Sequence, residues 1–233
     1  MKKKVSAKST KKEEILDLVK LNTNTQTVKT RALITPKIAL TLLKNGNKRF
    51  VSNKPLNRDL LKQVKDTSGK GGQKPYATVL SCIDSRVSSE LIFDQGIGDI
   101  FSIRIAGNFV NTDILGSMEF ACKAAGTKLI VVLGHTSCGA VGGACNDVQI
   151  GNLGSLLGKI RPAVNAIVQP KNPKQRTAEN KDFVNVVATK NVKLNIQRIL
   201  NESTILAQMV ADGDIMVVGG MYDIATGKVK ING

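Results

Sequence analysis

A run of consecutive apolar residues, Leu129 to Leu133, constrains the fold more than any other segment of this 233-residue chain. An unbroken run of this kind is typical of a strand covered on both faces, as in the centre of a parallel sheet. Strands are also expected over 76–83, 100–105 and 215–218, and helical segments separate them along the chain. Strands that alternate with helices predict an α/β domain with a mostly parallel sheet.

Helices are expected before and between these strands, over 35–50, 88–93, 112–125, 154–168 and 177–200. The first begins at Thr35 and Pro36, which are a preferred cap and a preferred first-turn residue. A last strand over 228–232, after Thr226 and Gly227, is expected to return antiparallel. The predicted fold is therefore a mostly parallel central β-sheet flanked by helices, with an antiparallel edge strand at the C-terminus.

The first 30 residues differ in composition from the rest. Residues 1–12 contain six lysines and no acidic residue. The sequence Thr10-Lys11-Lys12-Glu13 matches a capping box ahead of a short amphipathic helix, and the polar residues 22–30 indicate a linker. We therefore expect a basic N-terminal arm with a short helix over 1–30, followed by one catalytic domain over 31–233.

The formal net charge of +16 raises the question of an anionic partner. Aromatic residues make up only 3% of the chain, so platforms for stacking bases are scarce, and no nucleic-acid-binding motif accompanies the charge. A lysine-rich solvated surface is the favoured explanation, and no nucleic-acid partner is expected. No membrane association is expected either, because no apolar run approaches the roughly 20 residues of a membrane span.

The four cysteines, at 82, 122, 138 and 145, form an improbable disulfide framework for a chain of this size. Metal binding in a reducing compartment is the better interpretation. The lysine-rich start is not followed by the apolar segment of a signal peptide. A cytoplasmic location is therefore expected, with the periplasm as the alternative if a leader has been removed.

Metal-binding side chains follow two of the predicted strands. Cys82 comes at the end of the first strand, and His135 and Cys138 follow the run at Leu129–Leu133. If the two strands are adjacent, these side chains meet at the carboxyl edge of the sheet, where α/β proteins place their functional crevice. Three ligands leave the fourth position of a tetrahedral Zn²⁺ open, which is the catalytic arrangement. Each residue alone is explained as ordinary core, but their joint placement favours a zinc site.

The pattern C-x-D-x-R over 82–86 and the pattern H-x-x-C over 135–138 resemble the two zinc-binding signatures of the β-carbonic anhydrase family. The similarity extends to the segments 101–108, 116–121 and 219–227 and covers roughly residues 35–233. The resemblance implies reversible hydration of CO₂ to bicarbonate and a proton by zinc-bound hydroxide. It also implies a homodimer or a dimer-based higher oligomer.

The resemblance assigns catalytic roles to Asp84 and Arg86. Asp84 would accept a hydrogen bond from the hydroxide, and Arg86 would hold Asp84 as a bidentate partner and keep it ionised. In a closed, inactive form of such enzymes the aspartate instead binds the metal, so Asp84 is also a conditional zinc ligand. Taken alone, the pair would be explained as a structural ion pair.

The same resemblance suggests substrate-binding residues. A glutamine at the position of Gln73 is typical of the branch of the family whose site stays open. In that branch the glutamine crosses the dimer interface to the substrate. Phe101 and Phe120 would line the CO₂ pocket, and Gly139 is also assigned to the substrate site. A surface loop position for Gln73 and ordinary core positions for the phenylalanines are the plainer explanations.

A regulatory bicarbonate site, which another branch builds from a tryptophan, a tyrosine and an arginine, is expected to be absent. The corresponding residues here are Val79, Phe120 and Arg104. Three alternative functions stay open from the sequence. They are hydrolysis of COS or CS₂ on the same fold, a catalytically inactive zinc- or bicarbonate-binding module, and nucleic-acid binding.

Overall fold

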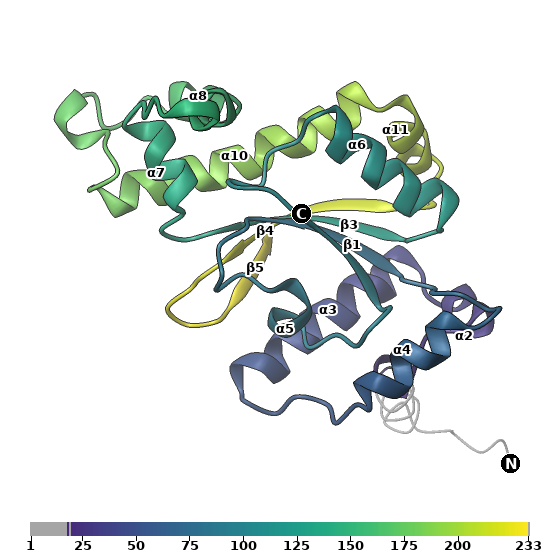
Figure 1. Cartoon of the computed structure of the whole chain (residues 1–233). Coiled ribbons are helices and arrows are strands. Elements are labelled where there is room, and N and C mark those ends of the chain that lie inside the picture. The colour runs from purple at the N-terminus through teal and green to yellow at the C-terminus, as the bar shows by residue number, and fades with distance from the viewer. Residues whose placement is uncertain (1–17, 19, 233) are drawn as a thin grey trace, which may run out of the picture.

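The computed structural model describes residue 18 and residues 20–232, and it has a five-stranded sheet between two layers of helices (Figure 1). The strand order is β2-β1-β3-β4-β5. The strands are β1 (Ala77–Ser81), β2 (Ile100–Arg104), β3 (Leu129–His135), β4 (Met216–Tyr222) and β5 (Val229–Asn232). The first four are parallel, and β5 pairs antiparallel with β4. The predicted fold class, including the antiparallel edge strand, is confirmed.

Most of the expected helices are present, although the region 154–168 contains two short ones instead of one. The helices are α2 (Val28–Ala32), α3 (Pro36–Val51), α4 (Leu60–Ser68), α5 (Ser89–Ile92), α6 (Thr112–Glu119), α7 (Gly139–Cys145), α8 (Gly151–Gly158), α9 (Arg161–Asn165), α10 (Lys181–Glu202) and α11 (Thr204–Ala211). A π-helical turn, Phe120–Ala124, continues α6, and a 3₁₀ turn spans Pro173–Gln175. None of the helices in the described part of the chain is long and apolar enough to cross a membrane.

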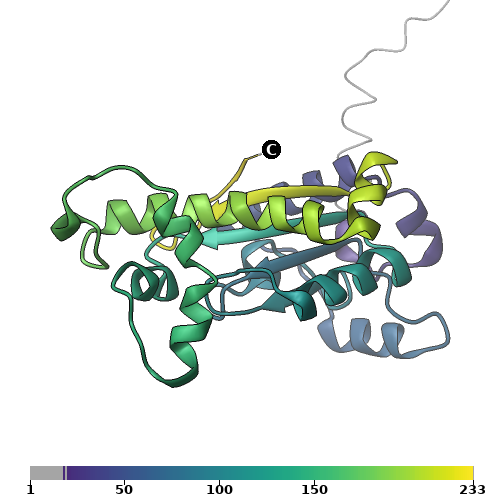
Figure 2. The ribbon, with the colours of Figure 1, turned by 90° about the horizontal axis from the view of Figure 1, so that it is seen from above.

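The two faces of the sheet have separate cores, because successive residues of a strand point to opposite sides. Val79 and Val131 pack on the face covered by α3, whereas Leu80 and Val132 pack on the face covered by α6 and α10. Both faces of β1 and β3 are buried, which explains the continuous apolar run in β3 and the mainly apolar sequence of β1, where Thr78 is buried too. Seen from above, α10 lies lengthwise over β3 and β4 (Figure 2).

The segment 22–30 is part of the packed structure, so the expected linker is wrong. Asn22 is buried and donates a hydrogen bond to Gln95 Oε1 at 2.8 Å, and Arg49 donates to Asn22 Oδ1 at 2.6 Å. The polar residues of this segment therefore take part in buried hydrogen bonds, and the segment is not a solvent-exposed linker. The expected helix at 13–19 lies largely outside the described residues, and the boundary between arm and domain stays a prediction.

Candidate metal centre

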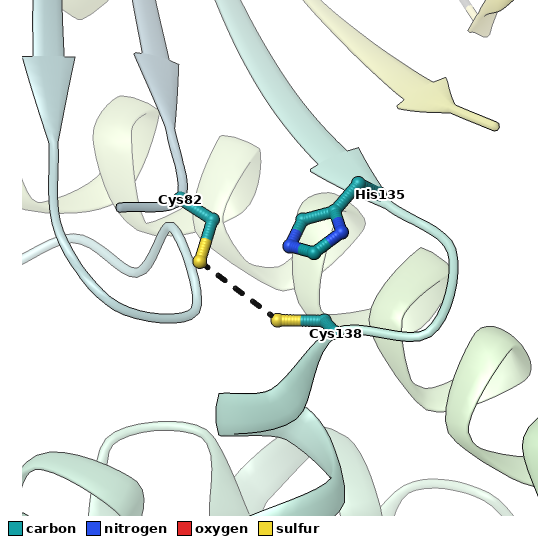
Figure 3. A group of neighbouring side chains, drawn as sticks. All are labelled: Cys82, His135 and Cys138. Carbon is teal, nitrogen blue, oxygen red and sulfur yellow. Dashed lines mark hydrogen bonds between the residues drawn. The ribbon is translucent and has the colours of Figure 1, made fainter. Parts of the chain in front are cut away.

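Three metal-binding side chains meet beyond the carboxyl ends of β1 and β3. The two strands are adjacent and parallel, with Val79 opposite Val131, so the residues that follow them emerge at the same edge. Cys82 directly follows β1, His135 is the last residue of β3, and Cys138 precedes α7. Their ligand atoms lie within 4.8 Å of one another, and the two sulfurs are 4.0 Å apart (Figure 3). The prediction that neighbouring strands bring these residues together is confirmed.

The imidazole of His135 is oriented as a metal ligand. His135 is fully buried, and its Nδ1 lies 3.0 Å from the carbonyl oxygen of Thr136. That contact requires the proton on Nδ1, which leaves a lone pair on Nε2. In the described structure Nε2 is buried and has no hydrogen-bond partner. A buried nitrogen lone pair without a partner is costly unless a cation binds it, so the site fits a metal ion.

The two thiols also favour a cation between them. The contact with Cys138 lowers the pKa of Cys82, and His135 and the Gly107 amide contribute to this, although burial opposes it. The same contact raises the pKa of Cys138, and burial adds to the increase. Without a cation, the second thiol therefore resists ionisation next to the first. A divalent ion removes this conflict because it compensates both negative charges.

Three groups form hydrogen bonds to the loops of this centre. The sequence analysis did not assign them this role. The Gly107 amide donates to Cys82 Sγ at 3.3 Å. Arg104 donates through Nε to the Cys82 carbonyl at 3.1 Å and through Nη2 to the Asp84 carbonyl at 2.8 Å. Asn185 Oδ1 accepts from the Ser137 amide at 2.8 Å. The loops that carry the candidate ligands are therefore fixed from β2 and from α10.

Asp84 and Arg86 form an ion pair beside the centre. Arg86 donates to the carboxylate through Nε at 2.9 Å and Nη2 at 2.8 Å, and its backbone amide donates at 3.0 Å. These bonds hold the pKa of the Asp84 carboxyl well below its usual range, although partial burial opposes the effect. The carboxylate lies on Arg86 and outside the group formed by Cys82, His135 and Cys138.

The candidate substrate residues lie at different distances from the centre within one chain. Gln73 is exposed and precedes β1, so it lies beyond the opposite end of a strand about 16 Å long. Phe101 of the edge strand β2 and Phe120 after α6 form a tilted ring contact, with centroids 6.3 Å apart. They line an open groove of about 580 Å³ that also includes Arg104. Gly139 is exposed, directly follows Cys138 and begins α7.

The two other cysteines are not part of this group. Cys122 is buried and lies 3.2 Å from the Thr127 hydroxyl, and Cys145 is at the C-terminal end of α7. Burial raises the pKa of both thiols. A raised pKa disfavours the thiolate that a metal requires.

Comparison of the sequence with known proteins supports the assignment of a metal centre. The profile of the family described as "Carbonic anhydrase" matches residues 77–229, which include all three candidate ligands. The chain belongs to the carbonic anhydrase family. Carbonic anhydrase 2 of Mycobacterium tuberculosis is 34% identical over 197 residues, which cover 84% of this chain and 92% of the relative. A carbonic anhydrase of Mycolicibacterium smegmatis is 34% identical over 198 residues, which cover 84% and 93%.

Solved structures assign this carbonic anhydrase to the β class. One of two tetrameric β-carbonic anhydrases from Sordaria macrospora matches with a TM-score of 0.61 and 28% identity, covering 73% of this chain and 85% of that one. The β-carbonic anhydrase CcaA matches with a TM-score of 0.64 and 25% identity, covering 82% and 94%. The resemblance stated from the two signatures is therefore confirmed.

Proposed function

We propose that this β-carbonic anhydrase is a zinc enzyme in which Cys82, His135 and Cys138 hold the metal. The observation that carries the proposal is the buried, unpartnered Nε2 of His135 beside two cysteine sulfurs. Thiolate and imidazole ligands suit zinc better than they suit Mg²⁺ or Ca²⁺, which prefer oxygen. Three protein ligands leave one tetrahedral position for reaction. Zinc bound in this way lowers the pKa of its water from about 15.7 towards about 7, which supplies hydroxide for attack on CO₂.

Asp84 and Arg86 are the proposed catalytic pair. Arg86 keeps Asp84 ionised, so the carboxylate is an acceptor at neutral pH. Two of the three donated hydrogen bonds go to Oδ1 and one goes to Oδ2, which leaves Oδ2 with an accepting lone pair. In this role the Asp84 carboxylate accepts a hydrogen bond from the attacking hydroxyl group and orients that group towards the carbon of CO₂. Binding of Asp84 to the metal belongs only to a closed form, in which Arg86 would release it.

A homodimer completes the proposed site. Gln73 lies too far along β1 to reach the metal centre of its own chain, so a substrate contact requires the glutamine of a second copy. The edge of β2, with exposed Phe120 and Ile83 beside it, is a suitable surface for that copy. In the dimer, Phe101, Phe120 and Gly139 would line the substrate site. The Sordaria macrospora relatives are described as tetrameric, which is compatible with a dimer-based assembly here.

The cytoplasm is the compartment that we propose for this enzyme. All four cysteines are free thiols, and two of them are candidate metal ligands that need to stay reduced. Thioredoxin and glutathione keep thiols reduced in that compartment.

A stopped-flow assay of the purified protein tests the proposed activity. Rapid proton release on mixing with CO₂, at a rate far above that of buffer alone, is expected. Parallel reactions with COS and CS₂ test the alternative substrates, which the names of the relatives do not favour. Zinc binding without CO₂ turnover would instead indicate an inactive binding module.

A further inference from the structure

Two buried asparagines on α10 form hydrogen bonds to the loop that follows β2. Asn191 and Asn195 are each 2% exposed and are one helical turn apart, so they share a face. Asn191 Nδ2 donates to the Gly107 carbonyl at 2.8 Å, and Asn195 Oδ1 accepts from the Val110 amide at 2.7 Å. Their neighbours on this helix face are apolar, so hydrogen bonds to the loop and to each other have to compensate their burial.

The two side chains are also bonded to each other. Asn195 Nδ2 donates to Asn191 Oδ1 at 3.0 Å and to the Asn191 carbonyl at 2.8 Å. The first of these bonds fixes which end of the Asn191 amide is the acceptor. The Nδ2 group of Asn191 is consequently directed towards Gly107.

The Gly107 peptide connects this pair to the candidate metal centre. Its carbonyl accepts from Asn191, and its amide donates to Cys82 Sγ at 3.3 Å. Gly107 has a φ of 76°, and a Cβ at this position would lie 2.3 Å from Ile160 Cδ1. A glycine is therefore required at this position. Because it has no side chain, the hydrogen bonds of its N–H and C=O groups set the orientation of its peptide.

A hydrogen bond to a ligand sulfur changes the bond that the sulfur makes to a metal. The N–H group withdraws electron density from the thiolate, so the sulfur donates less charge and the metal stays more electrophilic. Groups of this kind, one contact removed from the metal, typically change metal affinity or activity by 10- to 100-fold.

We infer that Asn191, oriented by Asn195, is a positioning residue of the metal centre, because it fixes the Gly107 amide on the sulfur of Cys82. This inference rests on the proposed zinc function. It assigns to the middle of α10 a role in ligand chemistry in addition to its packing on β3 and β4.

The test uses the full chain with Asn191→Ala and Asn195→Ala substitutions. Zinc affinity is measured by competition with a chelator, and the cobalt-substituted proteins are compared by absorption spectroscopy. We expect Asn191→Ala to weaken zinc binding by up to about 10-fold, the lower end of the range for direct partners of a ligand, because Asn191 acts through the Gly107 peptide. We also expect its thiolate-to-cobalt charge-transfer band to move to longer wavelength, because a sulfur without the hydrogen bond releases an electron more easily. Asn195→Ala keeps the bond from Asn191 to Gly107 but removes the bond that orients Asn191, together with those to the Asn191 carbonyl and the Val110 amide. It should therefore move the band less and in the same direction.

Asn47→Ala is the matched control. Asn47 is also a buried asparagine with several hydrogen bonds, to the Ile92 and Gly227 carbonyls and the Val229 amide. It lies on α3, on the other side of the sheet, so its loss should reduce stability without moving the cobalt band.

The outcomes separate this inference from the proposed function. A band at the wild-type position in both α10 variants would overturn the inference, whatever happens to their stability. If Asn191→Ala does not fold, the position of the charge-transfer band in Asn195→Ala tests the inference alone. A wild-type protein that binds neither zinc nor cobalt would overturn the proposed function, and the inference with it.

Discussion

Arg86 holds the carboxylate of Asp84 with a two-pronged contact, in which Nε lies 2.9 Å from Oδ1 and Nη2 lies 2.8 Å from Oδ2. The two residues are separated by a single position, so the β1 exit loop presents the acid and its partner together. The acid is two residues after Cys82, which explains why a five-residue pattern in the sequence carries both a candidate ligand and a candidate catalytic group.

Replacing Arg86 with alanine should reduce CO₂ turnover by about 10²-fold or more while one zinc stays bound. The reason is that Asp84 loses the partner that orients it, and preorganised groups of this kind contribute about this much. Stopped-flow turnover and metal content are measured on the same sample. Arg198→Ala is the matched control, since Arg198 makes a similar two-pronged contact with Glu202 on the surface of α10. Wild-type turnover in Arg86→Ala would contradict the proposed role.

The sequence predicted most of the sheet because β1 and β3 are buried on both faces and consist mainly of apolar residues, with Thr78 the one polar residue inside β1. It predicted the three candidate ligands because Cys and His at the ends of neighbouring strands are an unusual combination. The helices α4 and α7 were missed for physical reasons. In α4, Leu60, Leu61 and Val64 are exposed, so no core-facing stripe is present. The sequence of α7 contains three glycines, which disfavour a helix.

The supporting hydrogen bonds of the metal centre could not be predicted from local pattern. Asn191 reaches Gly107 over 84 positions, and only the packing of α10 on the sheet brings them together. A signal was nevertheless present. Asn191 and Asn195 occupy apolar positions of a helix that also buries Val187 and Val192. A polar residue at a core position requires a partner, so these asparagines could have been noted as candidates.

Turnover should depend on the concentration of a proton-accepting buffer. His135 is the only histidine in the chain, and the proposed site uses it as a ligand. No second histidine can carry protons away near neutral pH. We expect the maximal rate to rise steeply with an imidazole-type buffer at constant pH and ionic strength. A maximal rate that is independent of the buffer would indicate a proton relay through other groups.

Added bicarbonate should not cause cooperative inhibition. The positions that would need an indole N–H and a phenol hydroxyl hold Val79 and Phe120, and two donors of Arg104 already bond to backbone carbonyls. Each missing bond to a charged ligand costs about 1.5–3 kcal/mol, so two lower the affinity by a few hundredfold or more. Turnover measured from pH 7 to 8.5, with and without bicarbonate, should follow a single ionisation. A steep multi-proton loss of activity, deepened by bicarbonate, would contradict this expectation.

The stability of the fold should fall as the pH rises from about 4 to about 7 because of Asp99. Burial raises the pKa of this carboxyl to about 7, although the Gly96 amide and Arg58 oppose the increase. The folded protein therefore keeps a proton that the unfolded chain releases near pH 4. The free energy of unfolding should decrease by about 1.4 kcal/mol per pH unit between about pH 4 and pH 7 from this group, and level off above.

Asp99→Asn tests this pH dependence. In the described structure, Asp99 Oδ1 is buried without a hydrogen-bond partner, so a negative charge on this carboxyl is poorly compensated. Asparagine has nearly the same shape as aspartate and carries no titratable proton. Denaturant unfolding at a series of pH values should therefore show a smaller slope for the variant and higher stability than wild type at pH 8–9. Identical slopes for the two proteins would exclude Asp99 as the origin.

The most direct test of the central claim is a titration of the metal-free protein with zinc, followed by CO₂ hydration rate. The proposed site predicts that the rate rises linearly from the uncatalysed level and stops rising at one zinc per chain. Cys145→Ala should reproduce this titration, whereas Cys138→Ala should stay at the uncatalysed level because it loses one of three ligands. Full turnover without added zinc, or a Cys138→Ala protein that titrates like wild type, would contradict the account.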